Sequence, residues 1–253
     1  MRDAFLIQEG VLFRADPLFS SAFGYTPVTA LIEGIWNTCP DQAFSLLRER
    51  IYSNYAFTPA CEGMIKVAAK RASSLTEIEF LEQMRSGTSD KVVRPKSFEI
   101  PFQLDLKLPS PSDQEKAAFV LKAKSKSLHS LHRYESDRAV GAALFGKDNQ
   151  LLEASWNTNA GNKVLHAELN LIRTFQTKNK TQIPDHSEIW VSLKPCAMCA
   201  ALIYSGANNP ETIRIVYLED DPGPFSKNSV LCEGSDLWVK AGRPKLHLKQ
   251  YQG

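Results

Sequence analysis

Residues 112–253 alternate between strand-like and helix-like segments, and this alternation restricts the fold more than any other feature of the sequence. Ser112 and Glu115 have the spacing of a capping box, which predicts a helix that begins there. Further helices are predicted at 165–175, 196–205 and 236–239. Strands are predicted at 138–146, 151–156, 188–193, 213–218 and 245–251. Strands and helices that alternate along the chain predict an α/β sandwich.

The N-terminal residues follow a different order. Residues 5–14 are predicted to form two strands joined near Glu9 and Gly10. Helical spacing of apolar residues then predicts four helices, near 28–35, 44–55, 59–68 and 74–84. Ser74 and Glu77 have a capping-box spacing, which predicts the start of the fourth helix.

The hydrophobic period changes abruptly at residues 98–108, where apolar and polar residues strictly alternate. This period of two predicts a strand with one buried face. The segment Pro109-Ser110-Pro111 then ends the pattern and predicts a domain boundary. The sequence therefore predicts an α+β N-terminal domain of unknown role, residues 1–111, followed by a second domain, residues 112–253.

The composition is that of an ordinary globular protein, with 43% hydrophobic and 23% charged residues. The net charge of +2 is too small to indicate nucleic-acid binding by itself.

The longest apolar run, 196–204, is far shorter than the ~20 residues that cross a bilayer. Gln8 and Glu9 interrupt the N-terminal apolar stretch, so a secretory signal is not expected. The five scattered cysteines favour a reducing cytoplasm over a disulfide framework.

Two short motifs carry the chemistry: His166-Ala167-Glu168 and Pro195-Cys196-Ala197-Met198-Cys199. Cys196 and Cys199 are three residues apart at a predicted helix start, so both sulfurs can bind one ion. Pro195 suits the helix start, because the N–H that it lacks would have no partner there. The positive end of the helix favours the thiolate form. With His166 as a third ligand, these residues predict a tetrahedral Zn²⁺ site that keeps one position open. Zn²⁺ lowers the pKa of water bound there to about 7.

Glu168 lies two residues from His166 on the same predicted helix. It can therefore lie beside the open metal position without binding the metal. A carboxylate in that place can take a proton from water and deliver it to a ring nitrogen and a leaving amine. We therefore expect Glu168 to be the catalytic residue.

His-x-Glu followed by Pro-Cys-x-x-Cys is the signature of the zinc-dependent cytidine and nucleic-acid deaminase superfamily. Trp156-Asn157 before the histidine, and Cys196-Ala197-Met198-Cys199-Ala200 after it, resemble the tRNA adenosine deaminase branch. The resemblance extends from residue 112 to the C-terminus, and it implies a three-layer α-β-α fold around a mixed sheet. Residues 1–111 resemble no family that we can name.

The resemblance also implies substrate-binding residues. In this superfamily an Asn just after the second strand contacts the base or ribose, and the resemblance places this Asn at Asn157. Asn159 is the competing position. Asn is also common in turns, so a purely structural role is the alternative. The backbone amide of Ala167 is implied to face the base. The loop 219–226 is implied to contact the groups that flank the base. Within this loop, Phe225 is either a platform on which a base stacks or a packing residue.

Two other interpretations of the cysteines stay open. Cys-x-x-Cys alone is also typical of a thiol redox pair, although that chemistry needs neither His166 nor Glu168. A structural zinc site needs a fourth protein ligand, which His186 or Cys232 could supply.

The sequence thus predicts a zinc-dependent hydrolytic deaminase of adenine or cytosine within RNA or another polynucleotide, with tRNA-like adenosine preferred. One Zn²⁺ per chain, with water or hydroxide as its fourth ligand, is the expected cofactor. The alternatives are a deaminase of free nucleosides, bases or small heterocycles, and a non-catalytic zinc module that binds nucleic acid. A cytoplasmic location without a membrane partner is expected, and a homodimer is considered by analogy with such enzymes.

Overall fold

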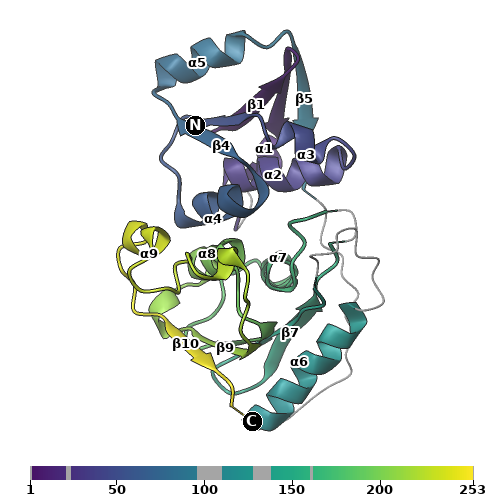
Figure 1. Ribbon diagram of the computed structural model, residues 1–253, viewed down its shortest axis with the longest axis vertical. Coiled ribbons are helices and arrows are strands. Elements are labelled where there is room, and N and C mark those ends of the chain that lie inside the picture. Colours follow the sequence, from purple (N-terminus) through teal and green to yellow (C-terminus); the bar gives the residue numbers. More distant parts are fainter. Residues whose placement is uncertain (1, 21–23, 96–109, 128–137, 160–161, 253) are drawn as a thin grey trace.

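The computed structural model describes residues 2–20, 24–95, 110–127, 138–159 and 162–252. Within these ranges the chain forms two five-stranded sheets, with helices packed between and around them (Figure 1). The predicted strand at 98–108 lies outside the described residues. Of the helices in the described ranges, none has the length and apolar character that crossing a membrane requires.

The first sheet is built from the N-terminal part of the chain in the order β4-β3-β1-β2-β5. Its strands are β1 (Ala4–Gln8), β2 (Val11–Ala15), β3 (Arg50–Ser53), β4 (Arg71–Ser74) and β5 (Ser89–Val93). The central strand β1 is antiparallel to β2 and β3, and the outer strands β4 and β5 are parallel to their neighbours. The accompanying helices are α1 (Pro17–Ser20), α2 (Pro27–Thr38), α3 (Ala43–Leu46), α4 (Pro59–Ala68) and α5 (Glu77–Arg85).

The predicted hairpin at the N-terminus is confirmed. Glu9 and Gly10 form its two-residue turn, with φ values of 52° and 80°. Positive φ at both central residues matches the right-handed twist of the paired strands, and Gly10 adopts it without steric cost.

The second sheet has the order β10-β9-β8-β6-β7. Its strands are β6 (Gly141–Phe145), β7 (Leu151–Trp156), β8 (Glu188–Leu193), β9 (Arg214–Glu219) and β10 (His247–Gln250). The strands β8, β9 and β10 run parallel to one another, whereas β6 is antiparallel to both β7 and β8. The helices of this half are α6 (Asp113–Ser127), α7 (Ala167–Asn179), α8 (Ala197–Gly206) and α9 (Asp236–Lys240), with short 3₁₀ turns at Pro210–Thr212 and Pro224–Ser226.

Helices cover both faces of the second sheet. In β6, Ala143 and Phe145 pack with Val120 of α6, whereas Ala142 and Leu144 belong to the core on the side of α7 and α8. Successive strand residues point to opposite faces, so a strand that is buried throughout must be covered on both. The predicted three-layer α/β fold around a mixed sheet is therefore confirmed.

The predicted helix at 44–55 is wrong. Only α3 is helical, and β3 instead hydrogen-bonds to β1 and β4. The apolar residues have helical spacing, but Phe44 is 41% exposed, whereas Ile51 is buried in the sheet. The cap predicted at Ser74 is also displaced: Ser74 ends β4, and Thr76 with Glu79 forms the capping box of α5. Strand pairing has overridden local periodicity here.

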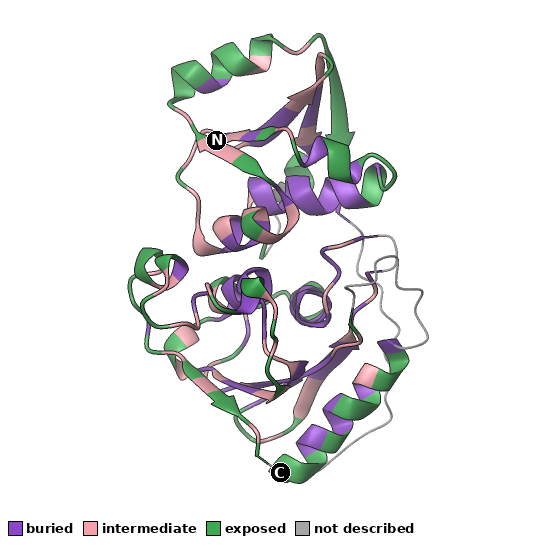
Figure 2. Cartoon of the chain, in the orientation of Figure 1, coloured by how far each residue is buried: buried purple, intermediate pink, exposed green. Residues whose placement is uncertain are grey.

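One hydrophobic core joins the two halves of the chain. The largest cluster of buried residues includes α2 and α4 from the N-terminal half and α7 and α8 from the C-terminal half. Figure 2 shows that buried residues gather in these helices, which lie between the two sheets. The division at residues 111 and 112 stays a prediction, but each half buries apolar surface against the other.

A buried ion pair crosses the same interface. Arg173 on α7 and Glu33 on α2 are each only 2% exposed, and Arg173 Nη2 lies 2.7 Å from Glu33 Oε1. Arg173 also donates to the carbonyl of Gly24, and its guanidinium lies 3.7 Å from the ring centroid of Tyr25. Each charge here depends on its partner, because neither has water to solvate it.

We expect Glu33→Gln to lower the free energy of unfolding by about 3–5 kcal/mol, because it leaves the Arg173 charge buried without its counter-ion. Urea denaturation of the zinc-loaded protein measures this. The matched control is Glu62→Gln, since Glu62 pairs with Lys240 at the surface and such pairs contribute about 0–1 kcal/mol. Equal effects of the two substitutions would contradict a structural role for the buried pair.

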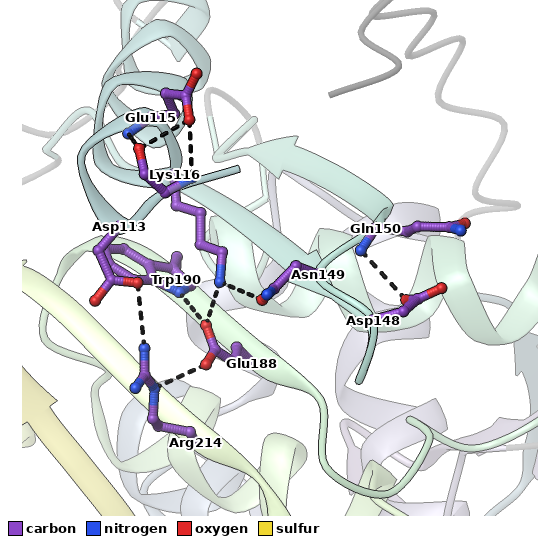
Figure 3. Close-up of polar contacts among 10 residues, drawn as sticks. Asp113, Glu115, Lys116, Asp148, Asn149, Gln150, Glu188, Trp190 and Arg214 are labelled. Atoms are coloured by element: carbon purple, nitrogen blue, oxygen red, sulfur yellow. Dashed lines mark hydrogen bonds and ion pairs between the residues drawn. The ribbon is translucent and has the colours of Figure 1, made fainter. Parts of the chain in front are cut away.

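A second charged cluster fixes α6 on the sheet at the end where β8 begins (Figure 3). Lys116 is almost fully buried, and its Nζ donates to Asn149 Oδ1 at 2.7 Å and to Glu188 Oε2 at 2.8 Å. Trp190 Nε1 donates to the same Glu188 oxygen at 2.9 Å, and Arg214 Nε lies 3.0 Å from the other oxygen. The ammonium is thus satisfied by hydrogen bonds and paired charge, as a buried cation must be.

Candidate metal centre and pocket

Two helices begin close together at the end of the second sheet where β8 ends. His166 is the N-cap residue of α7, and Cys196 is the N-cap residue of α8, with Cys199 in its first turn. Pro195 directly precedes this N-cap residue, at the helix start where it was expected. The first N–H groups of a helix have no partner within it and carry partial positive charge. The two helix starts therefore favour negatively charged ligands at this point.

The donor atoms of the three predicted ligands come together. His166 Nδ1 lies 3.7 Å from Cys196 Sγ and 3.5 Å from Cys199 Sγ, and all three atoms lie within 4.8 Å of one another. A tetrahedral zinc ion with ordinary bond lengths would separate a nitrogen and a sulfur ligand by about 3.6 Å. A hydrogen bond from Cys199, aided by His166, also lowers the pKa of Cys196 well below that of a free thiol. The geometry and the donor chemistry both fit zinc.

Among the described residues, the cluster of candidate ligands contains these three members and no fourth. Neither of the two alternative fourth ligands, His186 and Cys232, belongs to this cluster. The thiol of Cys232 instead donates to the carbonyl of Ser226 at 3.2 Å. An ion held by three protein ligands keeps one tetrahedral position for water or substrate, which is the arrangement of catalytic zinc sites.

Glu168 lies beside this cluster as the second residue of α7 and is buried. Its carboxyl group is in hydrogen-bond contact with the Cys199 thiol. Burial, followed by the negative charge on Cys196, raises the pKa of Glu168 to about 7. A carboxyl group buried beside an open metal position can accept a proton and pass it on.

A pocket of about 300 Å³ opens over His166, Glu168 and Cys196. This volume is at the lower end of the range for small-molecule sites. Apolar side chains, three basic side chains and amide groups share its lining: Val67, Val140, Leu193, Phe225, Arg138, Lys163, Lys194, Asn157 and Asn159. The cavity thus combines apolar walls with polar groups that converge on the candidate ligands.

Asn157 lines the pocket, but its amide is already fully engaged. Its Oδ1 accepts from Ser127 Oγ and from the backbone N–H of Val140, while its Nδ2 donates to the carbonyl of Arg138 at 2.7 Å and to Asn159 Oδ1 at 2.8 Å. A primary amide has two donor hydrogens and two acceptor lone pairs, and all four are used here. Asn157 therefore holds together the segments that surround the pocket.

We expect Asn157→Ala to destabilise the fold strongly, because each buried partner left without a hydrogen bond costs roughly 1–3 kcal/mol. Urea denaturation measures the change in the free energy of unfolding. The control is Asn208→Ala, which removes an exposed side chain whose Nδ2 donates to Asp185. An effect at Asn157 no larger than that at Asn208 would contradict this role.

The other predicted substrate residues have distinct positions. Ala167 is buried as the first residue of α7, so its N–H belongs to the helix start beside the pocket. Phe225 lies in the 3₁₀ turn Pro224–Ser226, lines the pocket and is 40% exposed.

Sequence reasoning missed six pocket residues: Val67, Arg138, Val140, Lys163, Leu193 and Lys194. Lys194 alone had a local signal, because it directly precedes Pro195-Cys196. The other five look like ordinary core or surface residues, and only the tertiary structure brings them to the pocket.

The three-layer fold, the His-Cys-Cys cluster and the adjacent buried glutamate are those expected of a zinc-dependent deaminase domain. Residues 131–236 match the model of the Bd3614-like deaminase family. The resemblance to the zinc-dependent deaminase superfamily that the motifs predict is thereby confirmed. A search of curated proteins gives no match.

Several solved structures are similar to part of this chain. One comes from a study of A-to-I editing by tRNA:A34 deaminases at the wobble position of transfer RNA, with 21% identity, 53% of this chain and 95% of that chain covered, and a TM-score of 0.38. A dCMP deaminase from the cyanophage S-TIM5 is 20% identical, with 56% and 100% covered and a TM-score of 0.37. A guanine deaminase from Nitrosomonas europaea is 17% identical, with 55% and 76% covered and a TM-score of 0.41.

Proposed function

We propose that this protein is a zinc-dependent hydrolytic deaminase of a nucleobase, with adenine or cytosine as the base. The observation that carries the proposal is the placement of His166, Cys196 and Cys199 at ligand spacing beside the buried Glu168, under a pocket that can admit a small heterocycle. A redox role for the two thiols would explain neither the histidine nor the glutamate.

Each residue has a defined part in this reaction. His166, Cys196 and Cys199 would hold the zinc ion, which supplies hydroxide at neutral pH when bound. Glu168 accepts the proton of the attacking water and delivers protons first to a ring nitrogen and then to the departing amine. The carbon–nitrogen bond to the exocyclic amine breaks, a carbonyl replaces it on the ring, and ammonia leaves.

Three groups support orientation of the base. Asn159 lines the pocket and is held in place by Asn157. We therefore assign the hydrogen bond to the substrate to Asn159 and not to Asn157. The backbone N–H of Ala167 at the start of α7 supplies a donor toward the base. Phe225 at the pocket rim offers a ring on which a base or its neighbour can stack.

The basic residues of the pocket support a substrate that carries phosphate. Arg138, Lys163 and Lys194 all contribute to the lining, whereas Asp221 is its acidic member outside the catalytic cluster. Phosphate groups are held largely by lysine and arginine. We therefore favour a base within RNA or another polynucleotide, with tRNA-like adenosine first, and such a base must leave its stack to enter the pocket.

Free nucleosides, bases or small heterocycles are the second candidate, because a pocket of about 300 Å³ also suits a single small molecule. A homodimer stays a prediction by analogy.

The test is a screen of the purified, zinc-loaded protein for ammonia release and for the mass change that accompanies replacement of an amine by oxygen. The panel compares free adenosine, cytidine and their bases with single-stranded RNA, single-stranded DNA and tRNA. We expect turnover of at least one adenine- or cytosine-containing compound. Absence of ammonia release, together with X-ray absorption showing four protein ligands on zinc, would instead identify a closed zinc module.

A further inference from the structure

The candidate pocket is not built from the C-terminal half alone. Val67, on α4 of the N-terminal half, lines it together with residues on either side of His166 and Cys196 in the sequence. Val67 also packs against the buried cluster that contains Ala197, Ala200 and Ala201 of α8. The wall that it forms is therefore continuous with the helix that carries both candidate cysteine ligands.

The position of α4 is fixed by close packing on α8. Gly63 lies one turn before Val67 on the same face of α4. A Cβ atom at Gly63 would lie only 2.6 Å from the carbonyl oxygen of Ala197 and 2.8 Å from the Cβ of Ala201. Because Ala197 directly follows Cys196, the two backbones meet beside the candidate metal ligands. Any larger residue at Gly63 would force the helices apart.

Further contacts join the two halves of the chain. Lys240 of α9 pairs with Glu62 of α4 through two contacts of 2.8 and 2.9 Å. Lys163, a lining residue of the pocket, places its ammonium group 5.5 Å from the ring centroid of Phe44 in α3. The buried pair of Glu33 and Arg173 connects α2 to α7, the helix that carries His166 and Glu168. The N-terminal half therefore contacts both helices of the candidate metal centre.

We propose that the N-terminal half is part of the substrate site, and that Val67 is a specificity-determining residue whose side chain limits the size of the nucleobase-bearing molecule that enters the pocket. The proposal rests on the proposed function for its substrate class. A planar heterocycle packs well between apolar side chains, and Val67, Val140 and Leu193 supply such surfaces from three different segments of the chain. Adding or removing bulk at Val67 therefore changes which substrates fit.

The experiment uses the full zinc-loaded chain with Val67→Phe, Val67→Ala and a control, Ile65→Phe. Ile65 lies on the same helix and packs against the shared core, but it does not line the pocket. Adenine, cytosine, adenosine, cytidine, their 5′-monophosphates and a short single-stranded RNA are the probes. Calorimetry gives the affinity of each probe, and kinetics give KM and kcat wherever there is turnover. Zinc content and melting temperature show that each variant is folded and loaded.

We expect Val67→Phe to raise KM or Kd at least tenfold for the accepted probes, with kcat for the bound substrate changed much less. Val67→Ala should change the ratio of kcat/KM between larger and smaller probes by about 10-fold or more, the size of effect that one or two methyl groups have in an apolar pocket. Ile65→Phe should leave both the affinity for the probes and the ratio of kcat/KM between larger and smaller probes unchanged.

The outcomes separate the two proposals. If the wild-type protein deaminates a probe and both Val67 variants behave like Ile65→Phe, the inference is wrong and the proposed function stands. If probes bind without turnover and Val67→Phe weakens their binding, the deaminase assignment fails while the pocket wall is supported. If the wild-type protein binds none of the probes, the proposed function and the inference about Val67 are both overturned.

Discussion

The Glu168→Gln variant is expected to fold and to bind zinc like the wild-type protein, but to lose turnover by about 10²–10⁴-fold or more. Positioned acid–base groups contribute factors of this size, and here one residue serves several proton transfers. Glutamine keeps the shape of the side chain but cannot accept a proton from the attacking water. Because Glu168 is buried and burial disfavours its charged form, a neutral amide should leave the melting temperature unchanged or slightly higher.

The measurements are zinc content, melting temperature and turnover on any active substrate, together with substrate affinity. Affinity should change much less than turnover, since Asn159 and the N–H of Ala167 are untouched. Glu153→Gln is the matched control, because Glu153 is also a buried carboxylate but pairs with Lys178 outside the pocket. Near-normal turnover of zinc-loaded Glu168→Gln would remove this residue from the mechanism, and the deaminase proposal would lose its main chemical support.

The second large effect concerns the metal. Cys199→Ser should reduce zinc from about one ion per chain to a small fraction, because a serine hydroxyl does not ionise at neutral pH and is a poor zinc ligand. It should also abolish most of the stabilisation that zinc supplies, which is about 4 kcal/mol when free zinc exceeds Kd by 1,000-fold. Metal analysis of the purified protein, and melting curves with and without added zinc, measure the two effects.

Cys61→Ser is the control for this substitution. Cys61 is another fully buried thiol, and its Sγ lies 3.2 Å from the hydroxyl groups of both Thr26 and Thr58, where a serine hydroxyl can take its place. It should keep full zinc content and a zinc-dependent melting temperature. Full zinc occupancy in Cys199→Ser would show that the ligand set is assigned incorrectly.

The C-terminal fold and the candidate metal ligands could be predicted because their signals are local. His166 and Glu168 are two residues apart, and Cys196 and Cys199 are three apart, so each pair is placed by a single helix start. Strand β8 contains the apolar run Ile189-Trp190-Val191, which is typical of a strand covered on both faces, and its bounds agree with the prediction. The sequence alone specifies how far apart two residues lie on one helix or strand.

In the N-terminal half, local patterns were less reliable for a physical reason. β4 and β5 consist of Arg71-Ala72-Ser73-Ser74 and Ser89-Asp90-Lys91-Val92-Val93, which have little strand preference of their own. They are strands because β3 and β2 supply backbone partners. In β3, Ile51 and its neighbours had helical spacing, but pairing with β1 and β4 decided their conformation.

The sequence by itself indicated the candidate donors His166, Cys196 and Cys199 and the carboxyl group of Glu168, because the two motifs combine residue types and spacings that are typical of this chemistry. Only the tertiary structure decided that the amide of Asn157 is used within the protein, and that Val67 forms a wall of the pocket. Both facts depend on contacts between segments far apart in the chain. Such contacts follow from how the helices of the two halves pack to bury their apolar faces, and no local pattern encodes that arrangement.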